Sequence, residues 1–312
     1  MAIPLVTMLG VFGVVAYTSI TTWLNLDRAP NLINATSVPI TTLVNLMQSE
    51  RRAAVVYLSH PDGNSLHVYQ TAVAATQADM GPLDAALNSA GTKSSENAEE
   101  AAAIGKLDAD VNGLSGLRQA VQAEQIASLD AFGGYTKVII DAPAVFQSEA
   151  TSLTDPTAAS QGLGLIETVN AHEDMAEQDA LLAGALAAGS LTPQERVAFA
   201  QAAGRQQDAT VLFDNLFNSA EKAEFTSTMN QLAPQAVQNQ FTSIQQDVEG
   251  GATVRLLKAG GLNGAAWQQL AAAMVNAHYR AGLAAAAGTL ANDQQIVNSY
   301  KTKVFAIGAG GV

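Results

Sequence analysis

Two similar segments decide the fold that this sequence predicts. Residues 48–58 read QSERRAAVVYL, and residues 176–186 read AEQDALLAGAL. Both fit a helical period, and each is followed at nearly equal distance by a turn and a second helical segment, residues 69–87 and 199–217. The repetition predicts two related helical units in tandem.

The composition indicates helices along the whole chain. Aromatic residues make up only 5% of the sequence, alanine and glutamine are abundant, and β-branched residues rarely alternate with polar ones. We therefore predict an all-α protein made of two tandem up-and-down four-helix bundles, residues 25–156 and 157–303. The expected helices are 37–59, 64–90, a short one ending near 110, 117–150 with an interruption at Gly133-Gly134, 157–188, 192–218 with Pro193 at its first position, 220–248 and 262–306.

The N-terminal segment predicts a membrane helix. Residues 1–24 contain no charged side chain, and the apolar run from Ile3 has the length of about 20 residues that a helix needs to cross a bilayer. Trp23 lies where an aromatic residue is expected at the membrane surface. A cleaved signal peptide is the alternative, although neither a basic start nor a small-residue cleavage site is clear. The apolar residues 304–312 are either the start of a second crossing or a frayed tail.

Charge and composition exclude several functions. The net charge of −13, with only 15 lysine and arginine residues, makes nucleic acid a poor partner. The chain has no cysteine, which excludes disulfides, thiol catalysis and thiolate metal sites. The sequence contains no phosphate-binding loop, zinc-type spacing or nucleophile elbow. We therefore expect no catalytic residue, metal or cofactor in this chain.

Charged residues fall on the apolar face of the first predicted helix. On a helical wheel, Glu50 and Arg51 lie within an apolar stripe, whereas Arg52 points away from it. Asp179 falls in the corresponding stripe of the second unit. Burying a charge without a partner costs on the order of several kcal/mol, so these charged groups need partners.

Two interpretations of Arg51 remain open. In the first, Glu50, Asp179 or Glu177 neutralises Arg51, and the ion pair fixes how the helices pack. In the second, Arg51, with Arg52 beside it, faces a cavity and donates forked hydrogen bonds to a small anion or a carboxylate ligand.

The segment Gln48-Ser49-Glu50-Arg51 resembles the opening motif of the nitrate- and nitrite-sensing (NIT) domain family, Gln-x-Glu-Arg followed by small residues and an apolar run. Residues 26–30, 179–189 and 195–199 are similar, in order and spacing, to the extracytoplasmic region of actinobacterial sensor histidine kinases that carry this domain. The resemblance extends over about residues 25–303. It implies an all-helical, dimeric double bundle that binds a small anion outside the cell and signals across the membrane.

The resemblance also implies where the ligand binds. We expect the site to include Gln48, Glu50, Arg51, Arg52 and Asp179. Two positions depart from the family pattern, because Arg52 stands where a glycine is usual and Asp179 mirrors Arg51. Members that sense nitrate are thought to clamp it between arginines from both halves, so an acid at this position argues against nitrate itself.

The sequence therefore predicts the extracytoplasmic sensory region of a membrane-bound receptor, a sensor histidine kinase of a two-component system whose catalytic part lies outside this chain. A ligand that prefers one packing of the helices would shift their tilt or axial offset. The alternative is a ligand-free, membrane-anchored scaffold that binds itself or another subunit. A vacant pocket lined by arginine would favour the sensor, and an Arg51–Asp179 pair filling that space would favour the scaffold.

Overall fold

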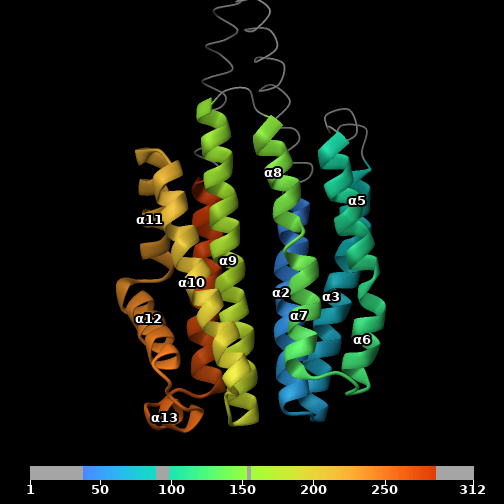
Figure 1. Ribbon diagram of the computed structural model, residues 1–312, viewed down its shortest axis with the longest axis vertical. Coiled ribbons are helices and arrows are strands. Elements are labelled where there is room, and N and C mark those ends of the chain that lie inside the picture. The colour runs from blue at the N-terminus through green and yellow to red at the C-terminus, as the bar shows by residue number, and fades with distance from the viewer. Residues whose placement is uncertain (1–37, 89–97, 153–155, 286–312) are drawn as a thin grey trace, which may run out of the picture.

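The computed structural model describes residues 38–88, 98–152 and 156–285, and every regular element within these ranges is a helix (Figure 1). The prediction of an all-α fold is therefore confirmed. Within the same ranges, no helix combines the length and the apolar character that a membrane crossing needs. The predicted membrane helix, residues 1–24, and the apolar end, residues 304–312, lie outside the described residues.

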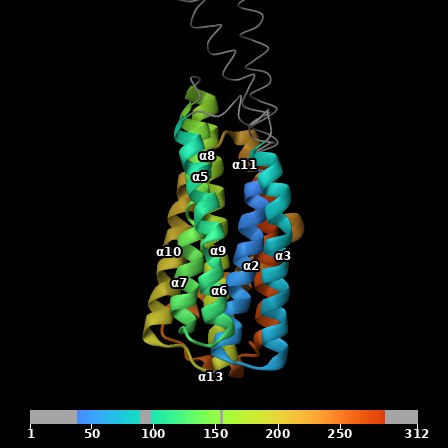
Figure 2. The same cartoon turned by 90° about the vertical axis from the view of Figure 1, so that its right-hand side faces the viewer.

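Most helices run along one long axis, as both views show (Figures 1 and 2), and Figure 1 shows that they lie in two groups. The first group consists of α2 (Val38–Ser59), α3 (Gly63–Leu87), α5 (Ala98–Asn112), α6 (Leu114–Gln122), α7 (Ser128–Ile139) and α8 (Ala142–Ser152). The second consists of α9 (Pro156–Ala188), α10 (Pro193–Leu216), α11 (Ser219–Leu232), α12 (Gln235–Glu249), α13 (Val254–Ala259) and a helix over residues 264–285. The division into four-helix domains at 25–156 and 157–303 stays a prediction.

Local sequence explains how two of these helices begin. Thr192 accepts a hydrogen bond from the backbone N–H of Glu195, whose side chain accepts in return from the N–H of Thr192, and Pro193 occupies the first helical position of α10. Asn218 and Glu221 form the same reciprocal cap at the start of α11. Both arrangements satisfy backbone N–H groups that have no partner within the helix. The predicted start at Pro193 is therefore confirmed.

Several predicted helix boundaries were wrong, and the helix expected over 117–150 is divided into α6, α7 and α8. Gly133 and Gly134 lie inside α7 rather than at a break, and a Cβ at Gly134 would lie 2.9 Å from Leu117, so the glycine allows close packing. The chain turns instead before α7, where Glu124 has a φ of 53°. The helix expected over 220–248 is divided at Pro234, which lacks a backbone N–H. α13 forms between residues 248 and 262, where no helix was predicted.

The buried apolar side chains form two clusters, one in each group of helices. The cluster of the first group includes Tyr69 and Tyr135, and that of the second includes Phe199 and Trp267. The clusters meet where α2 packs against α9, since Val55 of α2 belongs to the second cluster. This junction places the polar side chains of α2 opposite those of α9.

Candidate functional site

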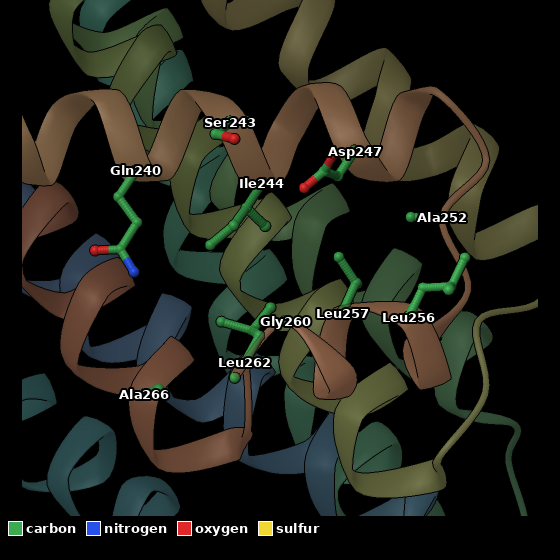
Figure 3. A pocket seen from close by; sticks show the side chains of 11 residues that line it. Gln240, Ser243, Ile244, Asp247, Ala252, Leu256, Leu257, Gly260, Leu262 and Ala266 are labelled. Carbon is green, nitrogen blue, oxygen red and sulfur yellow. The ribbon is translucent and has the colours of Figure 1, made fainter.

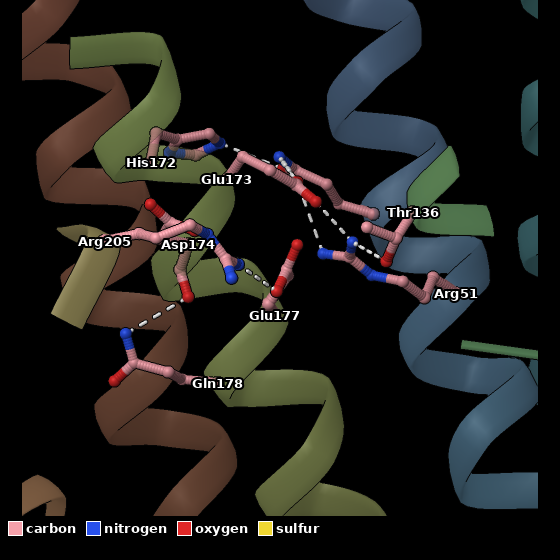
Figure 4. A network of polar contacts seen from close by, with 9 residues as sticks. Arg51, Thr136, His172, Glu173, Asp174, Glu177, Gln178 and Arg205 are labelled. Atoms are coloured by element: carbon pink, nitrogen blue, oxygen red, sulfur yellow. Dashed lines mark hydrogen bonds and ion pairs between the residues drawn. The ribbon is translucent and has the colours of Figure 1, made fainter. Parts of the chain in front are cut away.

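The central turns of α9 carry polar side chains although they are buried on every side. Residues 171–178 are all buried, because α2 packs on one side of α9 and α10 on the other. Five of these eight residues are polar or charged, namely His172, Glu173, Asp174, Glu177 and Gln178. Figure 4 shows that they lie between Arg51 of α2 and Arg205 of α10. We name this set, with its partners on α2, α7 and α10, the α9 network.

Arg51 and Glu173 form the centre of the α9 network. The Arg51 side chain is fully buried, and both of its terminal nitrogens donate to the Glu173 carboxylate, Nη1 to Oε1 and Nη2 to Oε2, the latter at 3.3 Å. Nη1 also donates to Thr136 Oγ1 of α7 at 2.8 Å, and the guanidinium lies 5.2 Å from the centre of the Phe132 ring. Arg51 thus connects α2, α7 and α9.

Burial raises the pKa of Glu173, while Arg51 opposes the shift. A carboxyl group in a dry environment is more easily protonated, and a neighbouring cation favours its charged form. The guanidinium is therefore the main reason for which Glu173 can carry charge at this depth.

Gln48 contacts Glu173 from the other side and is itself held by His172. Gln48 Nε2 donates to Glu173 Oε2 at 2.7 Å, and Gln48 Oε1 lies 3.0 Å from His172 Nε2. The same His172 nitrogen lies 2.9 Å from Asn45 Oδ1, so it faces two acceptors and must carry the proton. Burial lowers the pKa of His172 to about 4, which leaves the ring neutral at pH 7.

Arg205 of α10 pairs with two further carboxylates of α9. Its Nε donates to Asp174 Oδ1 at 2.8 Å, and its Nη2 donates to Glu177 Oε2 at 2.6 Å. The Arg205 side chain is half-exposed, whereas both carboxylates are buried. Burial, aided by the charge of Glu177, raises the pKa of Asp174 to about 7 against the effect of Arg205.

Three glutamines continue the α9 network towards α12. Gln245 Nε2 donates to Gln178 Oε1 at 2.5 Å and to Gln206 Oε1 at 2.8 Å, while Gln178 donates to the carbonyl oxygen of Asp174 at 3.1 Å. Polar contacts therefore join α2 to α9 at Glu173, and a second set joins α9 to α10 and α12 through Asp174, Glu177 and Gln178.

Glu50 faces away from the α9 network although it precedes Arg51. Arg118 of α6 donates from Nε and Nη2 to the two Glu50 oxygens at 2.7 and 2.8 Å, and Tyr135 donates its hydroxyl to Glu50 at 2.7 Å. Tyr135 is in turn 2.9 Å from the hydroxyl of Tyr69. Glu50 thus fixes α2 to α6 and α7.

The five residues predicted for the site therefore separate into three groups. Gln48 and Arg51 meet at Glu173, Glu50 belongs to the pair with Arg118, and Arg52 Nε donates to Asp179 Oδ2 at 2.9 Å. Arg52 was expected to point away from the stripe that contains Arg51, yet both side chains reach α9. The pair that forms is Arg51–Glu173, not Arg51–Asp179.

Sequence reasoning missed the main partner. Neither Glu173 nor Arg205 was singled out, although Glu173 lies one helical turn before Glu177, which was. The sequence feature that could have revealed these partners is the density of carboxyl groups in α9. Four of these groups face three arginines of neighbouring helices. The carboxyl groups are Glu173, Asp174, Glu177 and Asp179, and the arginines are Arg51, Arg52 and Arg205.

A separate cavity of about 470 Å³ lies between α12, α13 and the start of the helix over 264–285 (Figure 3). Its wall combines apolar side chains such as Ile244, Leu257 and Leu262 with the polar side chains of Gln240, Ser243 and Asp247 along α12. It shares no lining residue with the α9 network, so the two features are distinct.

Comparisons with known proteins agree with this all-helical arrangement. The model of the family described as nitrate and nitrite sensing (NIT) matches residues 42–290, which is most of the chain. The solved structure of the NasR transcription antiterminator is similar, with a TM-score of 0.71 at 14% sequence identity, over 97% of this chain and 83% of that one. At this identity the similarity shows a shared fold and nothing more. No curated protein sequence matches the chain.

Proposed function

The chain belongs to the nitrate and nitrite sensing (NIT) family, and from this membership we propose that it is a sensory region that binds a small anion at Arg51. The observation that carries the proposal is the position of this guanidinium, fully buried at the junction of α2, α7 and α9. A forked donor in a dry site suits a planar oxyanion, because two parallel hydrogen bonds fix both its position and its orientation.

Binding at this site can move helices against each other, because the side chains that meet at Arg51 come from different helices. An anion that takes hydrogen bonds from Arg51 alters its ion pair with Glu173, which crosses the α2–α9 junction. A ligand that prefers one packing of these two helices shifts their equilibrium by its difference in affinity for the two arrangements. The expected output is a change in the tilt or axial offset of α2 against α9.

The proposal extends to the setting of the protein. We infer a membrane-bound receptor with its helical region outside the cell, acting as a homodimer in a sensor histidine kinase of a two-component system. The uncharged residues 1–24 support the membrane anchor, and the motifs shared with such kinases support the rest. In this proposal the chain has no catalytic step of its own.

One observation favours the alternative of a scaffold without a ligand. Arg51 and Arg52 are both paired with carboxylates of α9, Glu173 and Asp179, so their charges are neutralised within the chain. Such internal ion pairs are expected in a protein that needs only a fixed junction between its helices and binds no ligand there.

Calorimetry and thermal shift on the full-length chain with nitrate, nitrite and formate distinguish the two functions. We expect a sensor to be stabilised by at least one of these oxyanions, in proportion to the logarithm of its concentration above the Kd. Arg51→Lys keeps the positive charge but not the fork, so the affinity should fall by about tenfold or more.

The matched control is Arg118→Lys, which shortens another forked arginine that pairs with a buried glutamate, Glu50. This variant should bind the oxyanion as the wild type does. If none of the three oxyanions binds the wild-type protein, the scaffold is the correct function; if Arg51→Lys binds as tightly as the wild type, Arg51 has no part in recognition.

A further inference from the structure

We propose that Glu173 occupies the ligand position at Arg51 as an internal substitute, so that a planar oxyanion binds there together with one proton, which Glu173 takes up. This inference rests on the proposed function, because it concerns how the same site exchanges its occupant. It assigns a regulatory role to a residue that the sequence did not reveal.

The geometry of the carboxylate is the first argument. Glu173 presents two oxygens on one carbon to the two terminal nitrogens of Arg51, and the two groups face each other (Figure 4). Nitrate, nitrite and formate present the same pair of oxygens on one central atom. Any of them could therefore accept the hydrogen bonds that Glu173 accepts now.

The unused hydrogen-bonding capacity of Arg51 is the second argument. Its Nε is buried and has no hydrogen-bond partner among the described residues. A buried N–H without a partner costs free energy, so the carboxylate satisfies this guanidinium incompletely. A free ion is not tied to the α9 backbone as Glu173 is and can adopt a pose that also reaches Nε.

Charge makes the exchange depend on a proton. If an oxyanion bound while Glu173 stayed ionised, two negative charges would share one buried guanidinium, and like charges in a dry site strongly raise the pKa of one of them. Burial already raises the pKa of Glu173 before any anion enters. Protonation of Glu173 releases Arg51, and the site keeps its net charge when the anion arrives.

The groups around Glu173 on each neighbouring helix are consistent with this exchange. Among the residues that the structure describes, Arg51 on α2 is the only cation in hydrogen-bond contact with Glu173, and Thr136 on α7 is neutral. On α9 itself, Glu177 raises the pKa of Glu173 further, while the next carboxyl group, Asp174, pairs with Arg205 of α10. Other titratable groups nearby in the described part of the chain are His172 on α9 and His278 on the helix over 264–285, both held neutral by burial, and Asp179 on α9, which pairs with Arg52.

The test measures anion affinity and proton uptake together. Calorimetric titration of the full-length protein with nitrate, nitrite or formate at about pH 6, 7.5 and 9, in buffers of different ionisation enthalpy, gives both quantities. We expect uptake of one proton per anion above the pKa of Glu173. The Kd should then rise by about tenfold for each pH unit.

Glu173→Gln separates the roles of charge and shape. Glutamine keeps the size of the side chain but cannot ionise, so this variant should bind the oxyanion without proton uptake and with a Kd that does not change with pH. Asp174→Asn is the matched control, because burial likewise raises the pKa of Asp174, to about 7, and this residue lies next in sequence but pairs with Arg205. This control should keep the pH dependence of the wild type.

The outcomes distinguish a failure of the proton-coupled exchange from a failure of the proposed anion sensor. Binding by the wild type without proton uptake at any pH overturns the inference and leaves the proposed function intact. A pH dependence that Asp174→Asn abolishes also overturns it, since the proton would then enter at Asp174. If neither the wild type nor Glu173→Gln binds any of the three oxyanions, the proposed function itself fails. If Glu173→Gln does not fold, the proton uptake of the wild type and of Asp174→Asn still decides the question.

Discussion

Arg51 shows how far a buried charge can be inferred from sequence alone. Its place within an apolar stripe of α2 indicated that it would be buried and would need a partner, and its side chain is indeed fully buried. The identity of the partner could not be inferred, because α9 is buried all round between residues 171 and 178 and a helical wheel then has no polar side to exclude. The sequence offered Glu50, Glu177 and Asp179 as partners of Arg51, and Glu173 was not among them.

A second buried polar residue, His278, should govern acid stability. Burial lowers its pKa to about 3, and its ring packs edge-on against Phe225 at 5.2 Å. A histidine whose pKa is lower in the folded state contributes stability that is complete above its unfolded pKa of about 6.5 and is lost as the pH falls. We expect this histidine alone to cost the wild type on the order of 2 kcal/mol between about pH 7.5 and pH 5.

Urea unfolding of the wild type and of His278→Phe at these two pH values checks this expectation. The variant should lose less stability on acidification, by about that amount. Phe225→Leu is the control, because it disturbs the same packing without removing a titratable group and should keep the pH dependence of the wild type. An equal loss in the wild type and His278→Phe would show that His278 is protonated in the folded protein.

At the scale of the elements, proline and glycine explain both the correct and the incorrect boundaries. Pro193 was predicted to start a helix and does so, because the cap around it is local in sequence. Gly133 and Gly134 were expected to end a helix but lie inside α7, because the reason for Gly134 is a contact with Leu117, which the sequence does not show. Pro234 cannot continue a helix because it lacks a backbone N–H, so the division between α11 and α12 could have been predicted from the sequence.

The crossing of α2 and α9 should be sensitive to a single added carbon. A Cβ at Gly184 would lie 2.6 Å from Val55 Cγ1 and 3.0 Å from Ser59 Oγ, closer than these atoms can tolerate. We expect Gly184→Ala to destabilise the protein by about 1–3 kcal/mol, as overpacking of a close contact does. Chemical denaturation provides the measurement.

Gly204 in α10 is the matched control for this substitution. An added Cβ at Gly204 meets nothing within 4 Å, so Gly204→Ala should stabilise the helix by roughly 0.5–1 kcal/mol through reduced backbone freedom in the unfolded chain. If both variants shifted stability in the same direction, the close approach of α2 and α9 would not be a determinant of stability.

At the scale of the molecule, the two apolar clusters are joined rather than independent. Val55 and Phe132 come from the first group of helices but pack in the second cluster, while Ile166 of α9 packs in the first. The ion pair between Arg51 and Glu173 crosses the same junction. Repetition in the sequence predicted two units, but it carried no information about the side chains that they exchange.

This junction predicts a single unfolding transition. Separating the two groups would leave Arg51 and Glu173 without each other and would expose both clusters, so neither group should unfold alone. Trp267 is fully buried in the second cluster, and the chain has two tryptophans, so Trp23→Phe leaves Trp267 as the fluorescent probe. Its fluorescence and the far-ultraviolet circular dichroism should follow one denaturation curve. Two separated curves would show that the groups are thermodynamically independent.

The enclosure of α9 also has a consequence for the natural variation of this chain. Between residues 171 and 186, only Asp179 is not buried, whereas buried and exposed positions alternate along α10. Substitutions at the exposed positions of α10 should have little effect, because only one side of this helix is buried. Along α9 almost every exchange must be matched by a compensating exchange on a neighbouring helix, so its history should be one of coupled replacements rather than independent ones.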